Sequence, residues 1–238
     1  MITPRFPKRK LFKEKKLSRI PELIVMLTHN DLTVDNALEI FSSCKKSSAD
    51  FWGIKEKSLP PEKMFELFSV LKKNKKTSAL EVVTYTEEGG LAGARLAEEC
   101  GCDILMGTIF FDSINEFCLS HNLKYMPFVG TVTARPSILD GSIEKMISDA
   151  KSYIKKGAYG IDLLGYRYTG NPYLLNETFI KNIDAPTCIA GSVDSYERLD
   201  EIKKISPWAF TIGSAFFEKK FGEEFLDQIN NVIAYMKN

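Results

Sequence analysis

The chain has 238 residues, of which 44% are hydrophobic and 26% are charged, and its net charge is +1. This composition is ordinary for a folded globular protein and excludes the disordered, collagenous and membrane-spanning classes. The length suits one large core and is too short for two enzymatic domains with a linker. Because the sequence has no run of about 18 apolar residues and no signal-peptide core, we expect a soluble, cytoplasmic protein without membrane contacts.

The N-terminal segment, residues 1–20, is strongly basic, with eight Lys or Arg and one Glu, so the remainder is mildly acidic. Nucleic-acid binding needs clustered cations where phosphates lie. We therefore expect no nucleic-acid partner unless this arm provides the contact. Three interpretations of the arm remain open, namely a flexible extension, an amphipathic helix that caps the bottom of the domain, or a polyanion contact.

From residue 21 onward, short apolar runs typical of strands alternate with amphipathic segments typical of helices. The eight runs are ELIVMLTHND (22–31), ADFWGIKE (49–56), SALEVVTYT (78–86), CDILMGTIFF (102–111), LKYMPFVGTV (123–132), YGIDLLGYR (159–167), PTCIAGSV (186–193) and AFTIGSAF (209–216). Helix starts are indicated near Thr33, Pro60-Pro61, Asp112-Ser113 and Ser142 with Glu144, and helix ends at Gly101 and Gly157. For Asp31 we favour a role as the cap of the helix near Thr33.

Eight such units with uniformly short loops, and no GxGxxG after the first run, favour a closed parallel barrel over an open doubly wound sheet. We predict an α/β protein with two parts, a basic N-terminal arm (1–20) and a single (β/α)8 TIM barrel (21–238). In such barrels the active site lies at the carboxyl ends of the strands.

The five cysteines are scattered and lack CxxC spacing, so we expect reduced, buried thiols. Cys100-Gly101-Cys102 is interpreted as the end of a helix entering a strand. His29 has no second ligand at a suitable spacing, and we predict neither a metal site nor a cofactor.

Polar residues at the predicted strand ends form a set suited to an oxygen-rich ligand. We expect catalytic roles for Lys55, Glu81 and Asp162, and substrate contacts for His29, Asn30, Thr108, Arg135, Tyr166 and Arg167. Burial and a neighbouring cation would lower the pKa of Lys55, which would let it act as a general acid/base or form a Schiff base. The alternative is a salt bridge from Lys55 to Glu56, Glu81 or Asp162 that ties strand ends together.

Two Gly-Ser pairs end the last two predicted strands, Gly191-Ser192 and Gly213-Ser214. Glycine lets backbone N–H groups approach an anion closely, and a helix start just beyond adds the positive end of its dipole. Phosphate-binding barrels place their site in these two loops. We predict phosphate binding by Gly191, Ser192, Gly213 and Ser214, although small residues also serve tight turns in barrels that bind no phosphate.

The segment 157–221 resembles phosphate-binding (β/α)8 barrels of the ribulose-phosphate-binding type, among them N-acetylmannosamine-6-phosphate 2-epimerases and histidine-biosynthesis isomerases. Gly53-Ile54-Lys55 looks like the strand-two segment that carries the catalytic lysine of the epimerases, and residues 165–169 (GYRYT) look like their strand-six loop. The resemblance implies that Lys55 is catalytic. The sequence departs from the epimerases at Ala190, where they have a catalytic glutamate, and lacks the paired aspartates of the isomerases.

The leading functional hypothesis is a cofactor-independent isomerase or epimerase that acts on a small phosphorylated, sugar-like substrate by acid/base chemistry. The second is a class I aldolase or lyase that uses Lys55 as its Schiff base. The third is a non-catalytic barrel that senses a phosphorylated metabolite or binds RNA through its basic arm. A homodimer remains open, since no predicted helix marks an interface.

Overall fold

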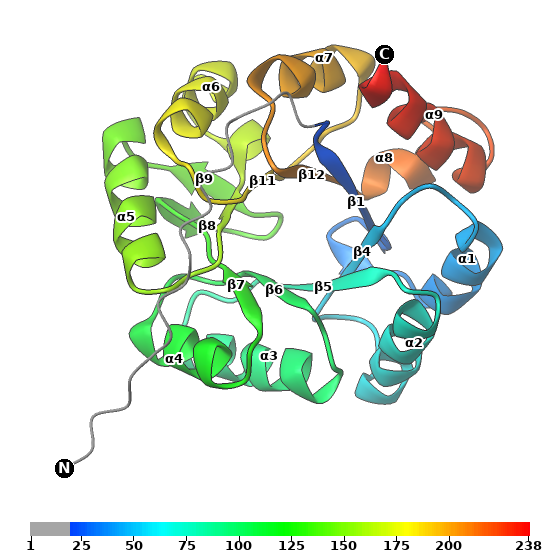
Figure 1. The fold of residues 1–238 in the computed structure, drawn as a ribbon, viewed down its shortest axis with the longest axis horizontal. Coiled ribbons are helices and arrows are strands. Elements are labelled where there is room, and N and C mark those ends of the chain that lie inside the picture. Colours follow the sequence, from blue (N-terminus) through cyan, green and yellow to red (C-terminus); the bar gives the residue numbers. More distant parts are fainter. Residues whose placement is uncertain (1–19) are drawn as a thin grey trace.

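The computed structural model describes residues 20–238, so the predicted basic arm lies outside the described residues except for Ile20. Parallel strands surround a central axis and helices form the outer ring (Figure 1). The eight strands of the sheet are β1 (Glu22–Met26), β4 (Phe51–Lys55), β5 (Thr77–Val82), β6 (Ile104–Gly107), β7 (Lys124–Met126), β10 (Ile161–Leu163), β11 (Thr187–Ile189) and β12 (Ala209–Ile212). The helices are α1 (Ala37–Cys44), α2 (Pro61–Lys73), α3 (Glu87–Glu99), α4 (Asp112–Ser120), α5 (Ile143–Lys155), α6 (Pro172–Asn182), α7 (Tyr196–Ile205), α8 (Ser214–Phe217) and α9 (Phe225–Lys237), with a 3-10 turn η1 at Gly165–Arg167.

The strands are ordered β10-β11-β12-β1-β4-β5-β6-β7, and every neighbouring pair is parallel. Backbone hydrogen bonds join the two ends of this order. The amide of Tyr159 donates to Tyr125 (2.9 Å), and the amide of Asp162 donates to Pro127 (3.0 Å). The ring therefore closes, and the predicted (β/α)8 barrel is confirmed.

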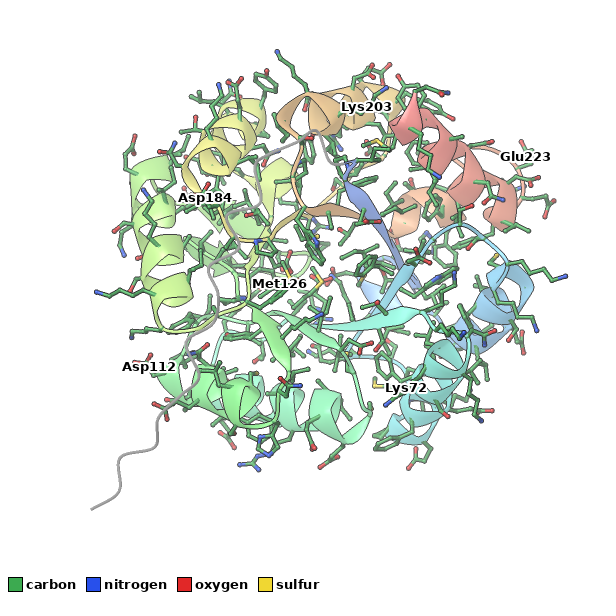
Figure 2. All side chains as sticks on the ribbon, in the orientation of Figure 1. Lys72, Asp112, Met126, Asp184, Lys203 and Glu223 are labelled. Atoms are coloured by element: carbon green, nitrogen blue, oxygen red, sulfur yellow. The ribbon has the colours of Figure 1, made fainter. Side chains whose placement is uncertain are left out.

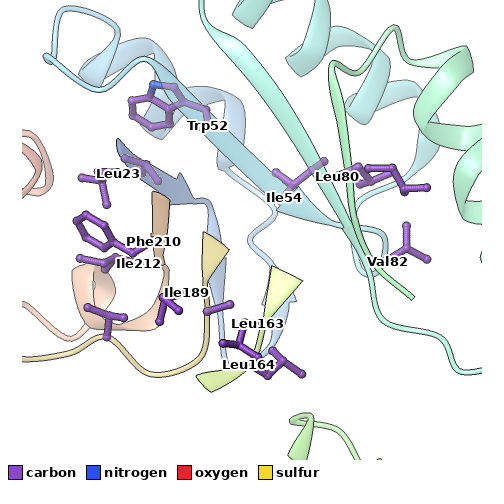
Figure 3. Packing of buried hydrophobic residues seen from close by; sticks show 14 of the residues in the cluster. Leu23, Trp52, Ile54, Leu80, Val82, Leu163, Leu164, Ile189, Phe210 and Ile212 are labelled. Atoms are coloured by element: carbon purple, nitrogen blue, oxygen red, sulfur yellow. The ribbon is translucent and has the colours of Figure 1, made fainter. Parts of the chain in front are cut away.

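Side chains alternate between the two faces of the strands, as the pleat requires. Trp52 and Ile54 of β4 belong to the large apolar cluster between the strands and the helices, together with Leu80 of β5 and Phe210 of β12 (Figure 3). The intervening residues of β4 and β5 face the barrel interior, and the last of these are Lys55 and Glu81, which are paired in register. Alternation thus places both charged groups inside the upper end of the barrel.

A second, smaller apolar cluster fills the interior of the barrel below these charges. Its members are Ile24, Met26, Ala79, Ile104, Met106, Met126, Cys188 and Ala209. Met126 lies near the middle of the ring, whereas Lys72 and Asp112 lie on the periphery (Figure 2). The interior is a packed core, as in barrels of this kind, and only the upper layer is left for chemistry.

Most predicted helix boundaries agree with the structure. Pro60 and Pro61 begin α2, and the Ser142 hydroxyl accepts a hydrogen bond from the Lys145 amide at the start of α5. Gly101 and Gly157 follow the ends of α3 and α5 with positive φ values of 66° and 108°. All five cysteines are free and buried, as expected.

Two local predictions are wrong. Asp31 does not cap a helix, because α1 begins only at Ala37, after Asn36. Thr33 instead belongs to the short hairpin of β2 (Thr28–His29) and β3 (Leu32–Thr33), where its hydroxyl bonds the backbone of Lys55. The loops are also not uniformly short, since a second hairpin follows β7, formed by β8 (Thr131–Thr133) and β9 (Ile138–Asp140).

Within residues 20–238, no helix combines the length and the apolar character needed to cross a bilayer.

Replacing Met126 by Ala tests the packed interior. Met126 is fully buried in the inner cluster, so the substitution is expected to lower the free energy of unfolding by about 2 to 5 kcal/mol in urea denaturation. Lys72→Ala, on the outside of α2, should change it by less than about 0.5 kcal/mol. Equal, small effects of both substitutions would contradict a close-packed barrel interior.

Candidate functional site

A polar cavity of about 250 Å³ opens at the carboxyl ends of the strands. Its lining comes from loops after several strands and combines charged side chains with glycine, serine and threonine. The lining residues are Thr28, Asp31, Lys55, Glu81, Ser137, Leu164, Arg167, Ala190, Gly191, Ser192, Val193, Asp194, Thr211, Gly213, Ser214, Ala215 and Glu218. Of the predicted site residues, the structure brings seven into this cavity: Lys55, Glu81, Arg167, Gly191, Ser192, Gly213 and Ser214.

One end of the cavity is formed by a buried ammonium group between two carboxylates. Lys55 Nζ contacts Asp31 Oδ1 at short range and lies 3.5 Å from Glu81 Oε1. The three residues are 8%, 8% and 6% exposed. A buried charge is stable only when it is paired and hydrogen-bonded, and here the loop after β1 and the strands β4 and β5 supply the pairing.

The protonation of Lys55 differs from the expectation. Burial is the largest influence and opposes the ammonium form, but the carboxylates of Glu81 and Asp31 outweigh it, and the pKa of Lys55 is raised above its ordinary value. Arg167 lowers it only weakly. The predicted lowering of this pKa is therefore wrong, because the neighbours of Lys55 are mainly acids. At neutral pH the Lys55 side chain is therefore an ammonium group.

Asp162 lies on β10 inside the barrel, fully buried and outside the cavity lining. Neither of its carboxyl oxygens has a side-chain hydrogen-bonding partner within residues 20–238, and the backbone group that favours its charged form is that of Gly107. Burial raises the pKa of Asp162 well above its ordinary value, the charge of Glu81 raises it further, and Lys55 lowers it. The surroundings of Asp162 beneath the Lys55 centre thus favour its neutral form, and its side chain does not line the cavity.

The glycine–serine turns line the opposite end of the cavity. The backbone amides of Gly191, Ser192, Ser214 and Ala215 donate to no acceptor among the described residues. The Ser214 hydroxyl accepts a bond from the Asn30 amide (3.2 Å). Glycine with φ of 86° at position 191 lets the loop turn tightly against the side chain of Arg167.

Arg167 is the cation of this end. Its side chain packs beside Gly191, and its guanidinium donates to the Ser137 carbonyl at 3.5 Å. It forms no ion pair within the described part of the chain. A guanidinium in a cavity next to unshared backbone amides is a ready ligand for an anion.

The other predicted substrate ligands lie outside the cavity lining. Arg135 is engaged by two carboxylates, through Nε to Asp31 Oδ2 (2.9 Å) and Nη1 to Glu56 Oε1 (3.1 Å). Thr108 is fully buried and bonds the Tyr125 hydroxyl at 2.6 Å. Thr108 directly follows β6, as predicted, but it does not line the cavity.

His29, Asn30 and Tyr166 also remain at the rim. The His29 ring stacks on Phe217, with 5.4 Å between centroids. Tyr166 donates its hydroxyl to the Arg198 carbonyl (3.3 Å) and packs against the guanidinium of Arg198. These rings support the loops around the cavity.

Asp31 and Ser137 are among the polar lining residues that the sequence analysis did not assign to the site. Asp31 follows a strand and precedes a helix, a position equally typical of a cap, and Ser137 lies in the β8–β9 hairpin, between the fifth predicted strand run and the helix start near Ser142. A cluster of three or more His, Cys, Asp or Glu suited to a metal is absent from residues 20–238.

The comparisons with known proteins bear on the fold. No protein-family model matches the sequence, and no curated protein matches it either. Solved structures do match. N-(5'-phosphoribosyl)anthranilate isomerase from Pyrococcus furiosus aligns over 92% of this chain and 99% of its own, with a TM-score of 0.64 and 15% identity.

N-acetylmannosamine-6-phosphate 2-epimerase from Clostridium perfringens aligns over 82% of this chain and 86% of its own, with a TM-score of 0.60 and 12% identity. A 4-hydroxy-2-oxoglutarate aldolase aligns over 90% and 92%, with a TM-score of 0.62 and 14% identity. The expected resemblance to phosphate-binding (β/α)8 barrels is thus confirmed for the fold.

Asp162→Asn tests the protonation of the buried carboxyl. A raised pKa means that the folded protein keeps a proton that the unfolded chain loses, so stability falls as the pH rises above the unfolded pKa of Asp, near 4. Asn cannot ionise in either state. We expect the variant to gain stability relative to the wild type between pH 4 and pH 7, measured by urea denaturation at each pH. A loss of stability at pH 7 would mean that Asp162 is ionised and paired.

Proposed function

We propose that this protein is an enzyme that isomerises or epimerises a small phosphorylated, sugar-like substrate through acid/base chemistry of its own side chains. The observation that carries the proposal is the division of charge in one cavity. At one end the carboxylates of Asp31 and Glu81 are paired with the Lys55 ammonium, and Asp31 is also paired with the Arg135 guanidinium. At the other end Arg167 forms no ion pair within the described residues and lies beside unshared amides, while the lining carboxylates Asp194 and Glu218 are paired with Arg198 and Lys220.

The end of the cavity lined by Arg167 suits the phosphate group of a substrate. Arg167 would pair with the dianion, while the amides of Gly191, Ser192 and Ser214 donate to its oxygens. A cavity of about 250 Å³ admits a molecule of a few carbons with one phosphate and leaves little room beyond it. The substrates named for two of the similar structures, a phosphoribosyl compound and a hexosamine phosphate, carry this group as well.

The end of the cavity lined by Lys55 and Glu81 suits the removal of a proton from a carbon next to a carbonyl group. Glu81 would accept the proton from the carbon beside the carbonyl, and the Lys55 ammonium would donate a hydrogen bond to the oxygen on which negative charge develops. In an isomerisation, Lys55 gives a proton to the carbonyl oxygen and regains one from the hydroxyl of the adjacent carbon, while Glu81 returns its proton to the former carbonyl carbon, so the net charge does not change. The Asp162 carboxyl lies beneath Lys55, and in its neutral form it would add no further negative charge to the site.

An aldolase or lyase that uses Lys55 as a Schiff base is the second candidate, since the fold is shared with an aldolase. Imine formation requires a neutral amine. The pKa of Lys55 is raised, with burial opposed and outweighed by Glu81 and Asp31, so the amine is held in its charged form. The arrangement therefore favours acid/base chemistry over imine chemistry.

The phosphate end is tested with inorganic phosphate as the probe. Ser192→Asp places a carboxylate among the predicted donors, so we expect at least a tenfold loss of phosphate affinity in calorimetric titration, because like charges repel in a partly buried site. Ser142→Asp is the matched control, since it caps α5 outside the cavity and Asp is also a good cap. Equal affinity of both variants and the wild type would contradict the phosphate site.

The catalytic end is tested by turnover of a panel of aldose and ketose phosphates. Lys55→Met is expected to lower kcat/KM by about 10²- to 10⁴-fold, the usual contribution of one acid/base group, with phosphate affinity retained. Lys72→Met, on the outer side of α2 (Figure 2), should leave turnover unchanged. Borohydride trapping of a keto-acid adduct at Lys55 would instead support the lyase.

A further inference from the structure

The hairpin of β8 and β9 reaches across the mouth of the barrel and touches the Lys55 centre. Arg135, at its tip, contacts Asp31 through Nε and Glu56 through Nη1. Arg135 also donates two hydrogen bonds to backbone carbonyls, from Nη1 to Val83 (3.3 Å) and from Nη2 to Asp31 (3.3 Å). One guanidinium thereby joins the loops after β1, β4 and β5.

Asp31 is shared between two cations. Its Oδ1 contacts Lys55 Nζ, its Oδ2 forms an ion pair with Arg135 Nε that is not aligned as a hydrogen bond, and its side chain is only 4% exposed. The backbone of Asn30 and Asp31 is left-handed, with φ of 49° and 67°. This turn directs the carboxylate inward, away from the helix that it was expected to cap.

The hairpin tip is held at other points as well. The Tyr85 hydroxyl donates to the Ala134 carbonyl (2.7 Å) and bonds the Ser137 hydroxyl (2.9 Å). Ser137 lines the cavity, and its carbonyl accepts from Arg167. The tip therefore contacts both ends of the cavity, which a loop that only covers the barrel would not need to do.

We propose that Arg135 is a positioning residue, which holds Asp31 against Lys55 so that Asp31 fixes the ammonium group at the cavity. Neither residue was assigned this role by the sequence. The catalytic consequence rests on the proposed function, whereas the positioning itself does not. The charged or titratable groups that face Lys55 are Asp31 from the loop after β1, Glu81 from β5, Arg167 from η1 and, more deeply, Asp162 from β10.

The sign of a pKa change separates positioning from a simple charge effect. Removal of a cation near Lys55 would by itself make protonation easier and raise the pKa of Lys55. Displacement of Asp31, which supports the charged form, would lower it. Arg135→Gln therefore raises the pKa if the guanidinium acts only through its charge, and lowers the pKa if the guanidinium holds Asp31 in place.

The experiment is a pH titration of the Lys55 side chain by NMR on protein with ¹³C-labelled lysine, with the resonance assigned through its loss in Lys55→Arg. Asp31→Asn is expected to lower the pKa of Lys55 by about one unit or more, the effect of removing an adjacent opposite charge. Arg135→Gln should also lower it. Arg135→Lys, which keeps the charge but not the fork of donors, should restore it only in part.

Arg95→Gln is the matched control, because Arg95 lies on α3 over the ring of Phe117, outside the cavity. It should leave the pKa of Lys55 unchanged. Thermal melts of each variant establish that it is folded at the pH values used. An unchanged or raised pKa in both Arg135→Gln and Arg135→Lys would overturn the positioning role.

Turnover supplies a second, separate readout. If the phosphosugar panel yields a substrate, the basic limb of the kcat/KM profile should move to lower pH in Asp31→Asn and Arg135→Gln, in step with the NMR titration. If the pKa of Lys55 measured by NMR falls while the basic limb of the kcat/KM profile does not move, the positioning role stands and Lys55 is rejected as the catalytic acid. Absence of turnover on the whole panel would reject the proposed function alone.

Discussion

The buried ammonium group of Lys55 is the interaction on which the upper half of the barrel depends. A charge taken out of water is costly unless partners surround it. Here the partners come from three separate segments: Asp31 from the loop after β1, Glu81 from β5, and Arg135, acting through Asp31, from the hairpin after β7. The strand ends must therefore converge for Lys55 to remain buried, and convergence of the strand ends is what creates the cavity.

The two arginines near the cavity differ in their pairing. Arg135 has two carboxylate partners and contributes to the order of the loops. Arg167 has a carbonyl partner only, within residues 20–238, and lines the cavity beside Gly191. The two arginines at the mouth of the barrel thus differ in their capacity to bind an anion, because a guanidinium that is already paired with carboxylates is less available to a further anion.

The similar structures, at 12% to 15% identity, share the barrel and not its side chains. A barrel of this kind supports many reactions, since the reaction is decided by the loops at the carboxyl ends of the strands. In this chain the loops at that end include the β8–β9 hairpin, and Asp31 and Glu81 surround Lys55. The two carboxylates favour the charged over the neutral form of Lys55.

The sequence by itself determined the barrel, the inward position of Lys55 and Glu81, and the pair of glycine–serine turns, because strand periodicity and loop glycines are local properties. Only the tertiary structure decided that Asp31 is an ion-pair partner rather than a cap, that Arg135 is engaged and Arg167 free of an ionic partner among the described residues, and that Thr108 and Asp162 lie away from the cavity lining. It also reversed the direction expected for the pKa of Lys55. The ion pairs and the pKa values of these side chains depend on groups that lie far apart in the chain, so a local sequence pattern does not determine them.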